Sequence, residues 1–286
     1  MSDNINKVIS RAEALIGKLE ALFHVPLQPV DWSAHAWRWV MHNNVGSLQA
    51  VAHPHQISLE NIQFVDAQKA EMVRNTRQFL QGLPANHVLL TGARGTGKSS
   101  LIKGLLHEYA KDGLRLIEVE KHDLVYLNQI VNLVRNRKEK FIIFCDDLTF
   151  EANDIGYKAL KVVLDGSIAG GADNVLIYAT SNRKNLMPEM MADNLAIKHA
   201  DGEIRPNETL DEKVALAERF GLWLSFYPFD QDEYLAIAEN WLKTFNVDWN
   251  TAASQAALSF SHTRGMRSGR VAYQFARDYA GKLRLK

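Results

Sequence analysis

Residues 92–99 combine glycines with a lysine and a serine at the spacing that binds a phosphate chain. The stretch reads GARGTGKS and matches the pattern G-x-x-x-x-G-K-S, which is called Walker A. The glycines allow the backbone to curl so that successive N–H groups face a phosphate chain. Lys98 can then reach the β- and γ-phosphates of ATP, and the Ser99 hydroxyl can ligate Mg²⁺. The expected nucleotide-binding residues of this loop are Gly92, Ala93, Arg94, Gly95, Thr96, Gly97, Lys98, Ser99 and Ser100.

The segments on either side of this loop have the required character. Residues 86–91, NHVLLT, form a short apolar run that is typical of a buried strand. The apolar residues that follow the loop have helical spacing. They are Leu101, Ile102, Leu105, Leu106 and Tyr109. Strand, loop and helix in this order favour a phosphate-binding loop over an ordinary glycine-rich turn.

Acidic and amide side chains follow two further apolar runs. Residues 141–147 read FIIFCDD, a Walker B pattern in which the two acids end a strand. We expect Asp146 to hold Mg²⁺ and Asp147 to polarise the attacking water. Asn182 follows the run 174–180 and can hydrogen-bond the γ-phosphate or that water. The alternative for the two acids is a strand that ends in an ordinary polar turn, and the alternative for Asn182 is an ordinary turn residue at a strand end.

Composition limits the class of protein. The chain has 286 residues, with 33 basic and 33 acidic side chains, so nothing indicates a basic or acidic tail, although a local basic patch remains open. The single cysteine, Cys145, excludes an intramolecular disulfide and suits a reducing compartment. No apolar run has transmembrane length, and the first residues do not resemble an export signal. We therefore expect a cytoplasmic protein without membrane insertion.

Strand and helix patterns alternate and predict an α/β P-loop NTPase fold, a parallel sheet wound with helices. We divide the chain into an N-terminal helical extension (1–55), a nucleotide-binding domain (56–229) and a C-terminal α-helical lid (230–286). Further strands are expected at 114–119 and 222–227, helices at 66–80, 122–136, 153–165, about 234–245, near 250–260 and at 268–283, and a loop at 196–215.

The N-terminal extension contains an amphipathic pattern over 3–23, which predicts a helix. Residues 31–40 hold three of the six tryptophans. We expect a second helix here, buried against the first; the alternative is a docking surface for a partner. His53 and His55 are expected in a solvated loop, because no third metal ligand is spaced with them.

The segments GARGTGKSS, FIIFCDD, ATSNR, ERFG and RGMRSGR occur in the order found in AAA+ ATPases, and the chain resembles that family over 57–286. It is similar in particular to a bacterial AAA+ family of unassigned function. The resemblance implies a wound parallel sheet, an α-helical lid and assembly into a homo-oligomeric ring, for which a hexamer is one arrangement.

The resemblance also implies roles for individual residues. Asn182 resembles sensor 1, and Arg219 in ERFG resembles the arginine finger that a subunit gives to its neighbour. Arg270 resembles the sensor 2 arginine, with Arg267 as a rival for that role. The adenine is expected near residues 62–65, which include Val65.

Walker B departs from the common Asp-Glu pattern, because Asp147 stands where many AAA+ proteins have glutamate. Related branches also carry two aspartates, so this pair is compatible with hydrolysis, but the shorter side chain needs the water placed nearer. The residues expected to act in catalysis are Asp147, Asn182, Arg219 and Arg270.

These features favour an ATP-hydrolysing, oligomeric molecular switch or remodeller. A nucleotide-dependent scaffold with little hydrolysis is the alternative, and a P-loop small-molecule kinase would leave ERFG and the lid unexplained. The client is expected to be a macromolecule, either a protein or a nucleic acid. Residues 120–124 lack an aromatic–apolar–glycine pore loop, which disfavours protein threading.

Overall fold

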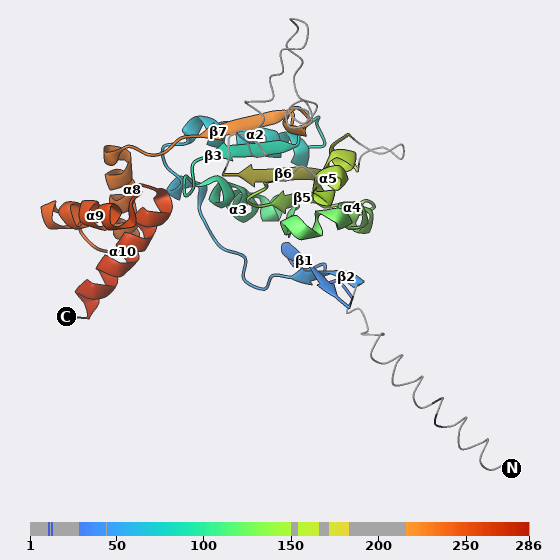
Figure 1. Ribbon diagram of the computed structural model, residues 1–286, viewed down its shortest axis with the longest axis horizontal. Coiled ribbons are helices and arrows are strands. Elements are labelled where there is room, and N and C mark those ends of the chain that lie inside the picture. The colour runs from blue at the N-terminus through green and yellow to red at the C-terminus, as the bar shows by residue number, and fades with distance from the viewer. Residues whose placement is uncertain are drawn as a thin grey trace, which may run out of the picture.

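The computed structural model describes residues 11, 13, 29–43, 45–149, 154–165, 172–182 and 216–285. In this part of the chain one sheet has the strand order β2-β1-β4-β5-β6-β3-β7 (Figure 1). The strands are β1 (Ala36–His42), β2 (Val45–Ala50), β3 (Val88–Gly92), β4 (Leu114–Glu118), β5 (Lys140–Cys145), β6 (Val175–Ser181) and β7 (Leu222–Phe226). The longer helices are α2 (Asp66–Leu80), α3 (Lys98–Tyr109), α4 (Leu127–Val134), α5 (Ile155–Asp165), α8 (Gln231–Thr244), α9 (Thr251–Arg264) and α10 (Gly269–Arg284). Short 3-10 turns lie at η1 (Leu59–Asn61), η2 (Ala110–Asp112) and η3 (Lys121–Tyr126).

The α/β fold expected from the sequence is confirmed, and every neighbouring pair of strands is parallel except β1 and β2. Strand β6 lies between β5 and β3, and Cys145 is paired with Ala179 while Thr91 is paired with Ser181. The carboxyl ends of β5, β6 and β3 therefore meet at one edge of the sheet. This register brings the Walker B acids, Asn182 and the phosphate loop to the same place.

Helices cover both faces of the sheet because alternate strand residues point in opposite directions. On β3, Leu90 belongs to an apolar cluster with Leu101 of α3, whereas Leu89 belongs to a second cluster with Ile130 of α4. Leu89 and Leu90 are both fully buried. A strand buried on both faces explains why the run before the phosphate loop is continuously apolar.

The C-terminal helices α8, α9 and α10 pack on one another beyond the end of the sheet, as Figure 1 shows in orange and red. The Tyr234 hydroxyl donates to the Ala257 carbonyl oxygen at 3.1 Å, which joins α8 to α9. Phe226 and Phe229 belong to the same apolar cluster as Tyr234, so the lid and the sheet share one core. None of the helices in the described part of the chain is long and apolar enough to cross a membrane.

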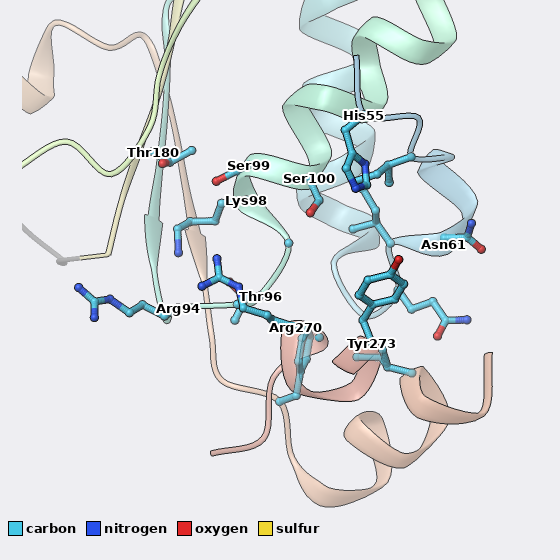
Figure 2. A pocket seen from close by; sticks show the side chains of 18 of the residues that line it. His55, Asn61, Arg94, Thr96, Lys98, Ser99, Ser100, Thr180, Arg270 and Tyr273 are labelled. Carbon is cyan, nitrogen blue, oxygen red and sulfur yellow. The ribbon is translucent and has the colours of Figure 1, made fainter. Parts of the chain in front are cut away.

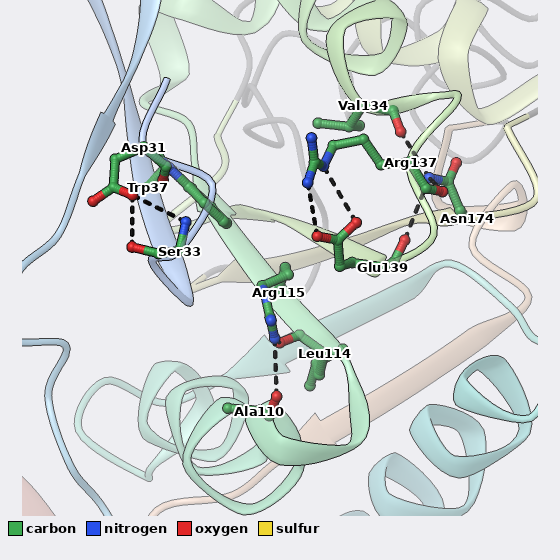
Figure 3. Close-up of polar contacts among 10 residues, drawn as sticks. All are labelled: Asp31, Ser33, Trp37, Ala110, Leu114, Arg115, Val134, Arg137, Glu139 and Asn174. Carbon is green, nitrogen blue, oxygen red and sulfur yellow. Dashed lines mark hydrogen bonds and ion pairs between the residues drawn. The ribbon is translucent and has the colours of Figure 1, made fainter. Parts of the chain in front are cut away.

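The helix expected over 31–40 is wrong, because this stretch leads into β1, which pairs with β4 and forms a hairpin with β2. Trp37 and Trp39 are buried on the same face, and Arg38 between them points out and binds Glu118, with Nη2 to Oε2 at 3.0 Å. The Trp37 indole N–H donates to the Asp31 carbonyl oxygen at 3.1 Å (Figure 3). Burial with a period of two identifies a strand, and the tryptophans fill the core beside β4.

Gly46 of β2 lets the hairpin close over Trp39. A Cβ atom at Gly46 would lie 1.9 Å from the Trp39 ring, so no larger residue fits without displacing the indole. The helix expected over 3–23 falls outside the described residues except for Arg11 and Glu13, which are helical. The loop expected at 196–215 also lies outside them.

His87 precedes β3 and holds the neighbouring strand. Its Nδ1 accepts a hydrogen bond from the Ile177 N–H at 3.0 Å, and burial lowers the pKa of the imidazole from 6.5 to about 4. Between these two values the unfolded chain binds a proton that the folded chain does not. The contribution of neutral His87 to stability is therefore complete above pH 6.5 and is lost as the pH falls towards 4.

We expect the free energy of unfolding of the wild type to fall over this interval by up to about 3 kcal/mol more than that of His87→Asn, whose amide oxygen can accept the same bond without titrating. Urea unfolding of both proteins at a series of pH values measures the difference. An identical pH dependence in the two proteins would contradict the role of His87.

Candidate nucleotide-binding and catalytic site

The phosphate loop joins the end of β3 to the start of α3. Gly92, Gly95 and Gly97 have φ values of 123°, 74° and 98°, which a side chain would disfavour. Lys98 is the first residue of α3, so the positive end of the helix dipole faces the same place as the loop amides. The loop has the local shape that its glycine spacing predicts.

The Lys98 ammonium is held inside this loop. It donates to the carbonyl oxygens of Gly92 at 2.8 Å and Ala93 at 2.6 Å, and to Asn182 Oδ1 at 3.2 Å. Burial lowers its pKa to about 8, against the opposing effect of the two Walker B carboxylates. A phosphate group would restore the charged form, because it replaces lost solvation with an opposite charge.

Asp146 lies directly opposite Ser99. The Ser99 hydroxyl donates to Asp146 Oδ1 at 2.6 Å, and the Thr180 hydroxyl donates to the same oxygen at 2.5 Å. A hydroxyl and a carboxylate in contact are the hard oxygen ligands that suit Mg²⁺, which takes its remaining ligands from water and nucleotide phosphates. The two residues expected to hold Mg²⁺ therefore fit that ion.

Asp147 has a left-handed backbone, with φ of 51°. Its N–H donates to Thr180 Oγ1 at 2.9 Å, and its Oδ1 accepts from Asn182 Nδ2 at 2.6 Å. Asn182 thus touches Lys98 through its oxygen and Asp147 through its nitrogen. A non-glycine residue held in this conformation by two side chains has a fixed carboxylate direction.

A cavity of about 710 Å³ opens over the phosphate loop, between the sheet and the lid (Figure 2). The residues that line it come from three parts of the chain. Besides the loop and the Walker B acids they include His55, Asn61, Ile62 and Gln63 before α2, and Trp241, Arg270 and Tyr273 of the lid. Val65, expected near the adenine, is buried and is not among the lining residues, whereas Ile62 and Gln63 are.

The two arginines proposed as sensor 2 lie in different places. Arg270 lines the cavity, and Figure 2 shows its side chain reaching from α10 towards Lys98. Arg267 lines a separate cavity of about 540 Å³ and donates to Gln231 Oε1 at 3.3 Å. This geometry favours Arg270 for the sensor 2 role. The Gly269 N–H donates to the Gly95 carbonyl oxygen at 2.9 Å, so the lid contacts the phosphate loop directly.

Arg219 is not among the residues that line the cavity. Its Nε pairs with Asp165 Oδ1 at the end of α5, at 2.5 Å. This position does not place the guanidinium on a phosphate of its own chain, so the role of arginine finger stays a prediction about a neighbouring subunit.

Several lining residues were not expected from the sequence. Thr180 orients both Walker B acids, and its place just before Ser181 and Asn182 at a strand tip is the signal that could have identified it. Tyr273, one turn after Arg270 in α10, could have been found from the same helical face. Cys145 is fully buried, and burial raises the pKa of its thiol to about 12, as suits a packing residue.

Residues 32–283 match the family described as "Protein of unknown function (DUF815)". The chain belongs to this family. It is similar to the FIGL-1 AAA domain solved in complex with ADP, with 16% identity over 81% of this chain and 76% of that chain and a TM-score of 0.54. This likeness shows the fold alone, and the fold is that of the AAA+ ATPases.

The RuvB Holliday junction branch migration motor of Thermotoga maritima has 17% identity over 77% of this chain, with a TM-score of 0.45. This chain spans 63% of the length of that RuvB chain. No curated protein sequence matches it.

Lys98→Ala is expected to weaken ATP binding by roughly ten- to a hundredfold near pH 7, because a charge-assisted contact is lost. Since the pKa of Lys98 is about 8, binding above that pH requires uptake of a proton. Above this pH, the ratio of the ATP affinity of the wild type to that of Lys98→Ala should therefore fall by at most about tenfold per pH unit. Calorimetric titrations with ATP between neutral pH and about pH 9.5 measure the dissociation constants of both proteins. A ratio of these constants that does not change with pH would contradict the role of Lys98.

Proposed function

We propose that this AAA+ protein binds ATP with Mg²⁺ and hydrolyses the bond between the β- and γ-phosphates. The observation that carries the proposal is the continuous set of contacts from Lys98 through Asn182 to Asp147. It connects a phosphate-binding cation to a carboxylate that can act as a base. The side-chain amide of Asn182 fixes the distance between the two.

The binding role rests on Lys98, Ser99 and Asp146. Lys98 would exchange its carbonyl acceptors for phosphate oxygens, and Ser99 with Asp146 would hold Mg²⁺. When bound, Mg²⁺ supplies positive charge that stabilises the phosphate oxygens during transfer. The cavity extends from these residues to Trp241 and Tyr273, which gives room for the base and sugar.

The catalytic role rests on Asp147. Its carboxylate faces the cavity edge and would accept a proton from the attacking water, while Asn182 holds that carboxylate in position. Aspartate is shorter than the glutamate common at this position, so the water must lie closer to the strand end. Thr180 fixes the backbone of Asp147 and thereby sets that distance.

We further propose a homo-oligomeric ring, such as a hexamer, that acts as a switch or remodeller of a macromolecular client. Arg219 would reach the ATP of the neighbouring subunit and would have to leave Asp165 to do so. The ion pair with Asp165 also favours the second candidate function. A scaffold that binds ATP and hydrolyses it slowly would keep Arg219 in this pair.

Asp147→Asn should bind ATP normally but release phosphate roughly 10² times more slowly, as expected for loss of a general base. Asp112→Asn, at an exposed position in η2, is the matched control and should leave the rate unchanged. Both are measured by phosphate release at saturating ATP and by separate binding titrations. Normal hydrolysis by Asp147→Asn would place the base elsewhere, with Glu151 as the next candidate.

Arg219→Ala should bind ATP normally but hydrolyse it poorly, because an arginine supplied in trans can contribute about 10³–10⁵ in rate. Specific activity of the wild type should rise with protein concentration. Mixing Arg219→Ala with Lys98→Ala should restore some activity, because a mixed interface unites an intact Lys98 with an intact Arg219.

Asp165→Asn breaks the ion pair but keeps the arginine, and it should retain activity or gain it. This control separates loss of the guanidinium from loss of the pair. A specific activity that does not change with protein concentration, together with no recovery of activity in the mixture, would contradict both the arginine-finger role of Arg219 and the ring assembly.

A further inference from the structure

We propose that Arg94 of the phosphate loop binds the terminal phosphate of ATP within the same chain, and that Arg94 and Arg270 form a two-arginine clamp around that phosphate. The inference rests on the proposed nucleotide site. The Walker A pattern allows any residue at the position of Arg94, and the proposal gives this residue a specific role. The clamp would distinguish ATP from ADP.

The first argument concerns which hydrogen-bond donors are available. Lys98, Arg94 and Arg270 are the cations of the loop and lid that line the main cavity. The three N–H groups of Lys98 already have acceptors in the protein. Arg94 and Arg270 are exposed, and neither side chain makes a hydrogen bond or ion pair with any other residue that the structure describes. Their guanidinium groups can therefore meet a phosphate without breaking a contact.

The second argument is geometric. Arg94 directly precedes Gly95, and Arg270 directly follows Gly269, and these two glycines are joined by the backbone hydrogen bond of 2.9 Å. A Cβ atom at Gly95 would lie 2.8 Å from Ser268 Cβ, so the loop and the start of α10 are in contact without a gap. The two arginines thus flank a single point of contact between loop and lid. Figure 2 shows the Arg270 side chain reaching towards Lys98, whereas the Arg94 side chain extends outward from the loop and would turn inward to meet a bound phosphate.

The third argument is electrostatic. Arg94 and Arg270 add two positive charges to that of Lys98 at one end of the cavity, where Asp146 and Asp147 supply two negative charges. Like charges gathered at one end of a cavity favour binding of a polyanion. A guanidinium also presents several donors in a planar fork that matches phosphate oxygens. ATP offers the clamp a terminal phosphate that ADP lacks.

A consequence for the lid follows. With ATP bound, the terminal phosphate would link Arg94 of the loop to Arg270 of the lid and reinforce the hydrogen bond between Gly95 and Gly269. With ADP bound, the two guanidinium groups would repel each other across the same contact. The closed lid is then favoured by ATP over ADP.

Arg94 also lines the smaller cavity, together with Arg267. Arg267 therefore provides a matched control, because it is a nearby arginine that does not line the main cavity and donates to Gln231 instead. If the guanidinium of Arg94 served the smaller cavity alone, its removal would affect nucleotide binding no more than removal of Arg267.

The test compares the dissociation constants of a non-hydrolysable ATP analogue and of ADP, both with Mg²⁺, for the wild type, Arg94→Gln, Arg267→Gln and Lys98→Ala. Arg94→Gln should lower the preference for the ATP analogue over ADP by about tenfold or more, with little change for ADP. Arg267→Gln should keep the wild-type preference. Thermal unfolding of each variant without nucleotide checks that the fold is retained.

An unchanged preference in Arg94→Gln, while Lys98→Ala loses affinity for both nucleotides, would overturn the clamp and leave the nucleotide site standing. If Lys98→Ala binds both nucleotides as tightly as the wild type, the nucleotide site and the clamp that depends on it both fail. Equal losses of preference in Arg94→Gln and Arg267→Gln would also overturn the clamp, because a general charge effect would explain them.

Discussion

The Thr180 hydroxyl, near the end of the strand between the two nucleotide motifs, fixes the chemistry of the site. It donates to the Asp146 carboxylate and accepts from the Asp147 N–H, so one oxygen orients both acids. The site depends on this because Asp146 must meet Ser99 while Asp147 must turn towards Asn182. Both acids follow the last residue of β5, and the backbone turns into the left-handed region at Asp147, whose carboxylate meets Asn182.

Much of this arrangement could be predicted from the sequence because it is encoded locally. The glycine spacing of residues 92–99 specifies its own loop, and the apolar runs before the loop and before Asp146 specify buried strands. The rule that ligands sit at the carboxyl ends of a parallel sheet predicts that the residues following these strands lie at one edge. The lid helices were likewise found where their periodicity predicts them.

The remaining features depend on contacts between distant segments. The strand at residues 36–42 is defined by its pairing with residues 116–118, which are distant in the sequence. The burial of Trp37 and Trp39 depends on this sheet, so it cannot be deduced from the residues around them. The choice between Arg267 and Arg270 depends on which residue of a turn faces the loop, and both fit the sequence pattern. Ile62 lines the cavity and Val65 does not, although both are apolar residues of the same short segment.

The burial of Cys145 has a practical consequence for observing the lid in motion. The chain has no other cysteine, and this thiol is enclosed in the sheet with a pKa far above neutrality. Maleimide dyes react with exposed thiolates, so they would not label Cys145. A pair of cysteines introduced on α9 and on α4 could therefore carry a donor and an acceptor fluorophore in the otherwise unaltered chain, and energy transfer between them would follow the approach of lid and sheet in single molecules.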